Sequence, residues 1–103
     1  MKQDAKKLLT QYALQPPKIL RLTAMAQADP AAKERCAAEA EHARRLMREI
    51  EEKIEQTDGG VLSELLYWKY VCGKTLEEIS EILHYSVRHT ERLHIKALEK
   101  FPR

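Results

Sequence analysis

Residues that cross-link or break the chain are scarce in this sequence. Its 103 residues include only two cysteines, three glycines and four prolines. Cys36 and Cys72 lie far apart and belong to no CxxC or CxxH pattern, so the sequence indicates neither a zinc knuckle nor a disulfide framework. We expect both thiols to be reduced, because free cysteine usually behaves as a small apolar residue. No metal or cofactor is predicted.

Long apolar runs are also lacking. No stretch approaches the ~20 apolar residues that a membrane-spanning helix needs. Residues 1–11, MKQDAKKLLTQ, contain no apolar segment of signal-peptide length. We therefore expect a cytoplasmic protein without a membrane partner. An enzyme is not expected either, because the sequence has no Ser/His/Asp set and no glycine loop that would cradle a phosphate.

Helix-forming residues dominate the composition. The chain is 44% hydrophobic and 33% charged, and its commonest residues favour helix. Its length suits one domain, or one small domain plus an arm. The aromatic residues Tyr67, Trp68, Tyr70 and Tyr85 lie close together in the sequence, and we expect them to be core rather than a platform for base stacking. The prediction is an all-α protein with its compact core in the C-terminal half.

The N-terminal segment, residues 1–58, is predicted to be helical. Helices are expected over 4–14 and 18–28, with Pro16 and Pro17 ending the first. Asp29 and Pro30 then suit the start of a long helix that reaches Gln56. Its apolar residues recur in steps of four and three, which indicates a heptad stripe and a coiled coil over 30–56. The stripe consists of Cys36, Ala40, Ala43, Met47, Ile50 and Ile54.

Two arrangements of this stripe, which spans residues 36–54, remain open from the sequence. The long helix can pack back on the N-terminal helices of its own chain, or it can pair with a second copy in a homodimer. The alanines allow close approach but bury little area, so a dimer would be weak at that end.

A second region, residues 59–103, begins after the helix-ending Gly59–Gly60. Three helices are expected there, over 61–71, 76–83 and 87–101. Thr75 and Glu78 form a capping-box pattern at the start of the second helix, and Ser86 suits the N-cap of the third. In that third helix the inward stripe is Thr90, Leu93, Ala97 and Leu98, joined by Phe101.

Acidic and basic residues are unevenly distributed along this second region. Residues 57–85 hold two Lys/Arg against five Asp/Glu, whereas residues 86–103 hold five against two. A short helix, a tight turn and a longer basic helix describe a helix-turn-helix, whose second helix places its outer face in the major groove of DNA. The predicted fold is therefore a set of N-terminal helices followed by a three-helix helix-turn-helix domain.

Three blocks of this region also resemble a known family. Residues 73–86, GKTLEEISEILHYS, resemble the fourth conserved region of bacterial sigma-70-type factors. Residues 97–101, ALEKF, look like the A-L-x-K-L that closes its recognition helix, and residues 66–70, LYWKY, look like the L-x-L-R-Y of the preceding helix. The resemblance covers residues 61–101. Because the other parts of a sigma factor have no room here, the chain looks more like the small phage- and prophage-borne regulators that carry such a domain.

The resemblance implies which residues contact DNA. The positions that read bases in the family are occupied by Val87, Arg88, His89, Glu91 and Arg92. The expected phosphate contacts are Lys69, Lys74, Thr75, Leu76 and Lys96. Val87 and His89 depart from the polar or charged residues of sigma factors, so the DNA sequence read should differ from theirs.

Three functions are consistent with these features. The first is a sequence-specific transcriptional regulator that binds double-stranded DNA. The second is a phage terminase small subunit, which also joins a helix-turn-helix to an oligomerising helical part. The third is a protein-interaction module, since region 4 of sigma factors also docks on RNA polymerase. His42, His84 and His94 are expected to be surface or turn residues rather than ligands.

Overall fold

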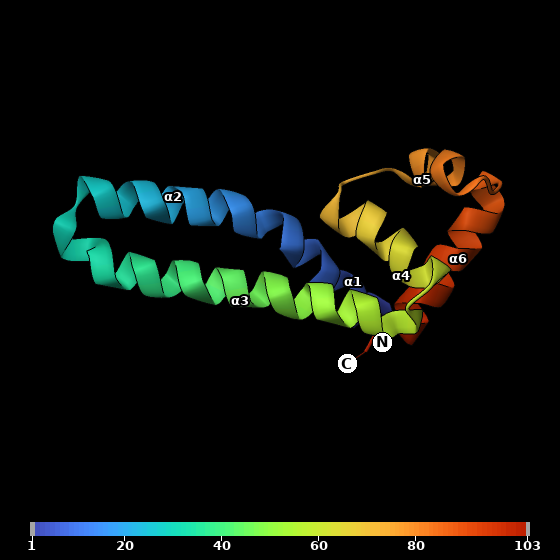
Figure 1. The fold of residues 1–103 in the computed structure, drawn as a ribbon, viewed down its shortest axis with the longest axis horizontal. Coiled ribbons are helices and arrows are strands. Elements are labelled where there is room, and N and C mark those ends of the chain that lie inside the picture. Colours follow the sequence, from blue (N-terminus) through green and yellow to red (C-terminus); the bar gives the residue numbers. More distant parts are fainter. Residues whose placement is uncertain (1, 103) are drawn as a thin grey trace.

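The structure, a computed structural model, describes residues 2–102, and over that range the chain is helical without strands (Figure 1). This confirms the all-α prediction. The α-helices are α1 (Lys2–Gln11), α2 (Gln15–Ala28), α3 (Lys33–Asp58), α4 (Val61–Leu66), α5 (Leu76–Leu83) and α6 (Val87–Lys100). Two 3₁₀ turns, Tyr12–Leu14 and Pro30–Ala32, join the first three, and a π-helical segment, Tyr67–Val71, continues α4.

The junction of α1 and α2 differs from the expectation. Helix α1 ends at Gln11, before the prolines, and a 3₁₀ turn leads into α2. Pro16 and Pro17 occupy the first turn of α2 rather than a break after the first helix. Proline is tolerated there because the first N–H groups of a helix have no partner within it.

Helices α2 and α3 form a long hairpin that extends away from the other helices (Figure 1). Asp29 caps the turn between α2 and α3, because its side chain accepts a hydrogen bond from the N–H of Ala31 at 3.1 Å. Leu22 of α2 packs in one cluster with Cys36 and Ala40 of α3. The first part of the apolar stripe is thus buried within the chain, so a homodimer through it would first require α2 to leave.

The main core lies where α1, α3, α4 and α6 meet. Ile50 and Ile54, the last two stripe residues, are fully buried there. This core includes residues from before and after Gly59, where the sequence analysis places the boundary between the two regions. Its buried members are Ala5, Leu9, Tyr12, Ile50, Ile54, Leu62, Leu66, Tyr70, Ala97, Leu98 and Phe101.

Asp58 joins α3 to α4. Gly59 ends α3 in the left-handed conformation, with a φ of 64°. The Asp58 carboxylate then accepts hydrogen bonds from the N–H groups of Gly60 at 2.7 Å, Leu62 at 3.2 Å and Ser63 at 3.0 Å. Slight burial raises the pKa of Asp58, but these bonds outweigh it and lower the pKa overall. The carboxylate therefore fixes the direction in which α4 leaves α3.

The predicted helix 61–71 changes its winding half-way. After Leu66 the chain is π-helical, and the N–H of Cys72 donates to the carbonyl of Tyr67 at 3.1 Å. Gly73, with a φ of 73°, ends the segment. Two of the four aromatic residues expected in the core lie at the surface instead: Tyr67 is 43% exposed and Tyr85 41%, because both fall outside the buried face.

No helix within residues 2–102 is long and apolar enough to cross a membrane.

Candidate nucleic-acid interface

The start of α5 is a closed capping box, as predicted. Thr75 Oγ1 accepts from the N–H of Glu78 at 3.2 Å, and the Glu78 carboxylate accepts from the N–H of Thr75 at 3.1 Å. These bonds lower the pKa of Glu78. Lys74 Nζ also lies 3.8 Å from the Glu78 carboxylate. Two predicted phosphate contacts, Lys74 and Thr75, are therefore engaged with a carboxylate, and the third residue here, Leu76, is half-buried.

A rigid turn separates α5 from α6. His84 adopts the left-handed conformation with a φ of 60°, and the N–H of Tyr85 donates to the carbonyl of Ser80 at 3.0 Å. Ser86 Oγ then accepts from the N–H of His89 at 3.1 Å. The hydroxyl of Thr90, which is fully buried, donates to the carbonyl of Ser86 at 2.9 Å. These bonds fix the start of α6, and they confirm Ser86 as its N-cap.

Helix α6 has a buried face and an exposed one. Thr90, Ala97 and Leu98 are buried, and Leu93 is half-buried, which confirms the predicted inner stripe. This face packs against α4 and α5. All five predicted base-reading residues lie on the exposed surface: Val87, Arg88, His89, Glu91 and Arg92. The structure thus brings this whole set together on the first turns of one helix.

Arg88 and Arg92 carry the two guanidinium groups on this face. They lie four residues apart, one turn of helix, so both guanidinium groups project from the same side. Neither forms an ion pair or hydrogen bond with another residue of the part of the chain that the structure describes. Each keeps its five N–H donors for a partner.

His89 has a neighbour that the sequence analysis did not identify. The ring of Tyr85, in the turn, meets the His89 ring edge-on, with 4.9 Å between ring centres and an angle of 89° between planes. Such edge-to-face contacts are favourable for aromatic rings. The spacing of four residues was the available signal, but it crosses a helix start, where spacing alone does not place side chains.

His94 is not the surface residue that was expected. It is half-buried, and its Nε2 lies 2.8 Å from the hydroxyl of Tyr70. Burial chiefly, and then the positive charges of Lys69 and Lys6, lower the pKa of His94 to about 4. Burial also raises the pKa of Tyr70 to about 12. Both groups are uncharged at neutral pH, and the bond ties the π-helical segment to α6.

The two remaining phosphate candidates differ in setting. Lys96 is exposed on α6, in line with Arg92 and His89. Lys69 is half-buried, and its Nζ lies 5.7 Å from the centre of the Tyr70 ring. The predicted phosphate contacts therefore do not form one cluster: they are spread over the start of α5, the exposed face of α6 and the π-helical segment.

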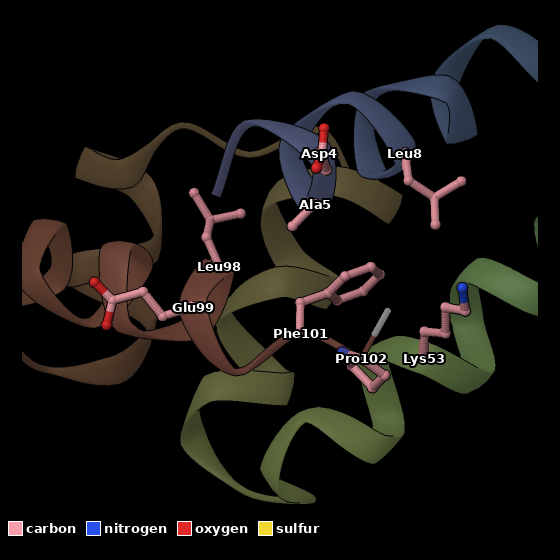
Figure 2. Close-up of a pocket in the computed structure, with 8 residues that line it drawn as sticks. All are labelled: Asp4, Ala5, Leu8, Lys53, Leu98, Glu99, Phe101 and Pro102. Atoms are coloured by element: carbon pink, nitrogen blue, oxygen red, sulfur yellow. The ribbon is translucent and has the colours of Figure 1, made fainter. Parts of the chain in front are cut away.

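A cavity of about 510 Å³ lies elsewhere, between α1, α3 and the end of α6. Figure 2 shows the Phe101 ring pointing between α1 and α3 at this cavity. Its charged groups all have partners: Lys53 pairs with Glu49 at 3.4 Å, Glu99 pairs with Lys2 at 3.3 Å, and Asp4 also interacts. The lining therefore presents no unpaired charged group that would act as an acid, base or nucleophile.

Metal-ligand residues do not gather in threes anywhere in residues 2–102. Cys36 is buried and Cys72 is exposed, both as free thiols. Cys72, at the end of the π-helical segment, is exposed although free cysteine usually behaves as a small apolar residue. No protein-family model, curated protein or solved structure matches the chain. The exposed face of α6 therefore carries the functional argument.

Proposed function

We propose that this protein is a sequence-specific transcriptional regulator that binds double-stranded DNA. In this proposal α5 and α6 act as a helix-turn-helix, and α6 enters the major groove. The observation that carries it is the exposed first half of α6, where Arg88 and Arg92 stand one turn apart without partners, on a helix whose opposite face is buried. The resemblance of residues 61–101 to sigma region 4 supports the same reading and a phage or prophage source.

The chemistry of the face suits base recognition. The major groove is about 12 Å wide and admits a helix. An arginine can donate two hydrogen bonds to one guanine, a contact worth about 1–3 kcal/mol of discrimination. The Glu91 carboxylate can accept from the amino group of cytosine, and the exposed side chain of Val87 can contact the methyl group of thymine. Lys96 is the clearest phosphate contact on the same helix.

The packing of α3 bears on the number of copies that bind. Since the stripe of residues 36–54 is covered within the chain, we propose that one copy of the protein binds each DNA site. A single asymmetric DNA site is then expected, rather than two half-sites related by symmetry. A terminase small subunit would instead bind as a ring of many copies.

A protein partner alongside DNA is the second candidate function. Helix α5 carries exposed carboxylates at Glu77, Glu78 and Glu81, next to Ile82, which is 39% exposed. An acidic surface with an exposed apolar residue repels DNA but suits a basic protein surface. RNA polymerase is the partner that the sigma-like resemblance implies for such a regulator in the cytoplasm.

The test is a selection from a pool of random-sequence duplexes at two salt concentrations, with the Arg88→Ala/Arg92→Ala variant in parallel. The proposal expects one enriched motif for the natural protein and none for the variant. Lys33→Ala/Arg35→Ala, at the far end of the hairpin, is the control of equal charge change and should enrich the same motif. No motif with the natural protein, or the same motif with the Arg88→Ala/Arg92→Ala variant, would contradict the proposal.

A further inference from the structure

A groove runs between the two helices of the hairpin, α2 and α3. The cavity in it has a volume of about 220 Å³, enough to admit apolar side chains of a partner. Six of the lining residues are apolar or small, and they come from both helices. They are Leu22, Thr23, Ala26, Cys36, Ala37 and Ala40. We refer to this cavity, with the two cations described below, as the hairpin groove.

The hairpin groove follows one side of α3. The α3 residues on this side are spaced four, three and four apart: Lys33, Ala37, Ala40 and Arg44. This spacing places them in one row along the helix. At 1.5 Å per residue the row is about 16 Å long, or three helical turns. A third helix laid along the hairpin can contact such a row, because helices pack by fitting side chains of one into grooves of another.

On the α2 side, the apolar surface continues beyond the groove. The hydroxyl of Thr23 donates to the carbonyl of Ile19 at 2.9 Å, so its polar group is already bonded within the helix. Leu20 lies one turn before Thr23, and so borders the groove. Its side chain is 72% exposed. A single exposed leucine is ordinary in proteins, but one that adjoins an apolar groove extends it into a surface of the kind that binds a partner.

The charges that line the hairpin groove are all positive. Lys33 and Arg44 belong to the lining, and no carboxylate of the described residues does. Lys33 has no ion-pair partner among residues 2–102. Arg44 lies 3.8 Å from the Glu41 carboxylate, but Arg48 also pairs with that carboxylate, at 3.2 Å. One carboxylate shared by two arginines leaves a surplus of positive charge beside the groove.

Helix α2 adds no acid to this surface. From Gln15 to Ala28 its charged residues are Lys18 and Arg21. A second copy of the hairpin would therefore bring the same cations against the groove, and like charges across an interface are unfavourable. A surface with carboxylates beside an apolar stripe complements it in both charge and polarity.

We propose that the hairpin groove binds an amphipathic helix of another protein, whose apolar residues enter the groove and whose flanking carboxylates meet Lys33 and Arg44. Helices that bind in grooves do so with apolar residues at spacings of three, four and seven. The hairpin extends away from α6 (Figure 1), so a helix in its groove leaves the exposed face of α6 open. The inference does not rest on DNA binding.

The experiment uses the full chain and a displayed library of helical peptides with one randomised face. Peptides of about 18 residues exceed the length of the groove at 1.5 Å per residue. The natural protein should enrich peptides with an apolar stripe at helical spacing and a net negative charge. Fluorescence anisotropy at two salt concentrations then gives the affinity of an enriched peptide, which should fall as salt rises.

Two pairs of variants locate the binding site. Ala37→Gln fills the groove from an exposed position and should weaken binding about tenfold. Ala38→Gln makes the same change at an exposed neighbour outside the lining and should bind as the natural protein does. Lys33→Gln/Arg44→Gln should lower both the affinity and its salt dependence. Arg92→Gln/Lys96→Gln, on α6, removes the same charge and should change neither.

Three results would overturn the inference. They are the absence of an enriched peptide, enriched peptides that lack carboxylates, and equal affinity of Ala37→Gln and the natural protein. Sedimentation velocity covers the alternative occupant. If the natural protein self-associates, and Ala37→Gln abolishes this while Ala38→Gln does not, the groove holds a second copy and the inference is wrong. None of these measurements involves DNA, so the proposed function stands or falls separately.

Discussion

The hydroxyl of Tyr70 and Nε2 of His94 share a hydrogen bond of 2.8 Å across the interface between the π-helical segment and α6. Tyr70 belongs to the buried core that also contains Leu66 and Leu98. Because a half-buried imidazole is costly to protonate, this pair makes the attachment of α6 sensitive to pH.

Acid should weaken the fold through His94. Its folded pKa of about 4 lies below the ordinary value of 6.5. Between these values the unfolded chain binds more protons, so the contribution of His94 is complete above pH 6.5 and is lost as pH falls toward about 4. After allowance for the exposed part of the ring, we expect the free energy of unfolding to drop by about 1 kcal/mol between about pH 7.5 and pH 5. Urea unfolding at both pH values measures it.

The matched variants are His94→Gln and His42→Gln. His42 is exposed on α3. His94→Gln should flatten the dependence on pH, whereas His42→Gln should leave it as in the natural protein. Equal pH dependence in all three proteins would show that His94 is not the group responsible.

Asp58 should be a strong determinant of stability despite its exposure. Its carboxylate accepts three N–H groups at the start of α4, the role of a helix cap. Asp58→Ala should lower the free energy of unfolding by about 1–2 kcal/mol. Asp58→Asn should cost less, because the amide oxygen can still accept. Glu55→Ala, one turn earlier on α3, is the control, and an Asp58→Ala protein that unfolds at the same urea concentration as this control would refute the role.

The two cysteines should report on the hairpin. Cys36 is 2% exposed between α2 and α3, whereas Cys72 is exposed. A thiol reagent should therefore modify Cys72 quickly and Cys36 only as the hairpin opens. Because α2 covers Cys36 within one chain, its protection should not change on dilution. Cys36 reactivity that rises as the protein is diluted would indicate burial between two copies instead.

Single substitutions on α6 should separate base reading from phosphate binding. Arg88→Ala should reduce the preference for the selected motif by about 1–3 kcal/mol. Lys96→Gln should keep that preference and lower the salt slope by about 0.9. Competition between specific and mixed-sequence duplexes at several salt concentrations gives both numbers. If Lys96→Gln changes the preference more than Arg88→Ala does, the assigned roles are reversed.

Local sequence signals predicted the helices well, and contacts between distant segments less well. The Thr75–Glu78 box, the Ser86 cap and the inner stripe of α6 are short-range patterns, and the structure confirms them. The side chain of His94 is half-buried beside that stripe, and its environment depends on Tyr70, which lies 24 residues away in the chain. Whether the stripe of α3 was covered by its own chain could not be read from α3 alone.

The π-helical segment shows a second limit. One extra residue in a turn rotates every following side chain, so the position of Cys72 could not follow from a period of 3.6. The proposed base-reading residues, by contrast, follow one another on a regular helix, and their common exposure was predictable.

Amide NMR of the labelled protein during titration with a short duplex of the selected motif tests the central proposal most directly. The proposal predicts that the largest shifts occur from Tyr85 to Arg92, with smaller ones at Lys96 and Lys69, and that α2 is unaffected. Shifts concentrated on the α2–α3 hairpin, or none at a DNA concentration that saturates nonspecific binding, would contradict it.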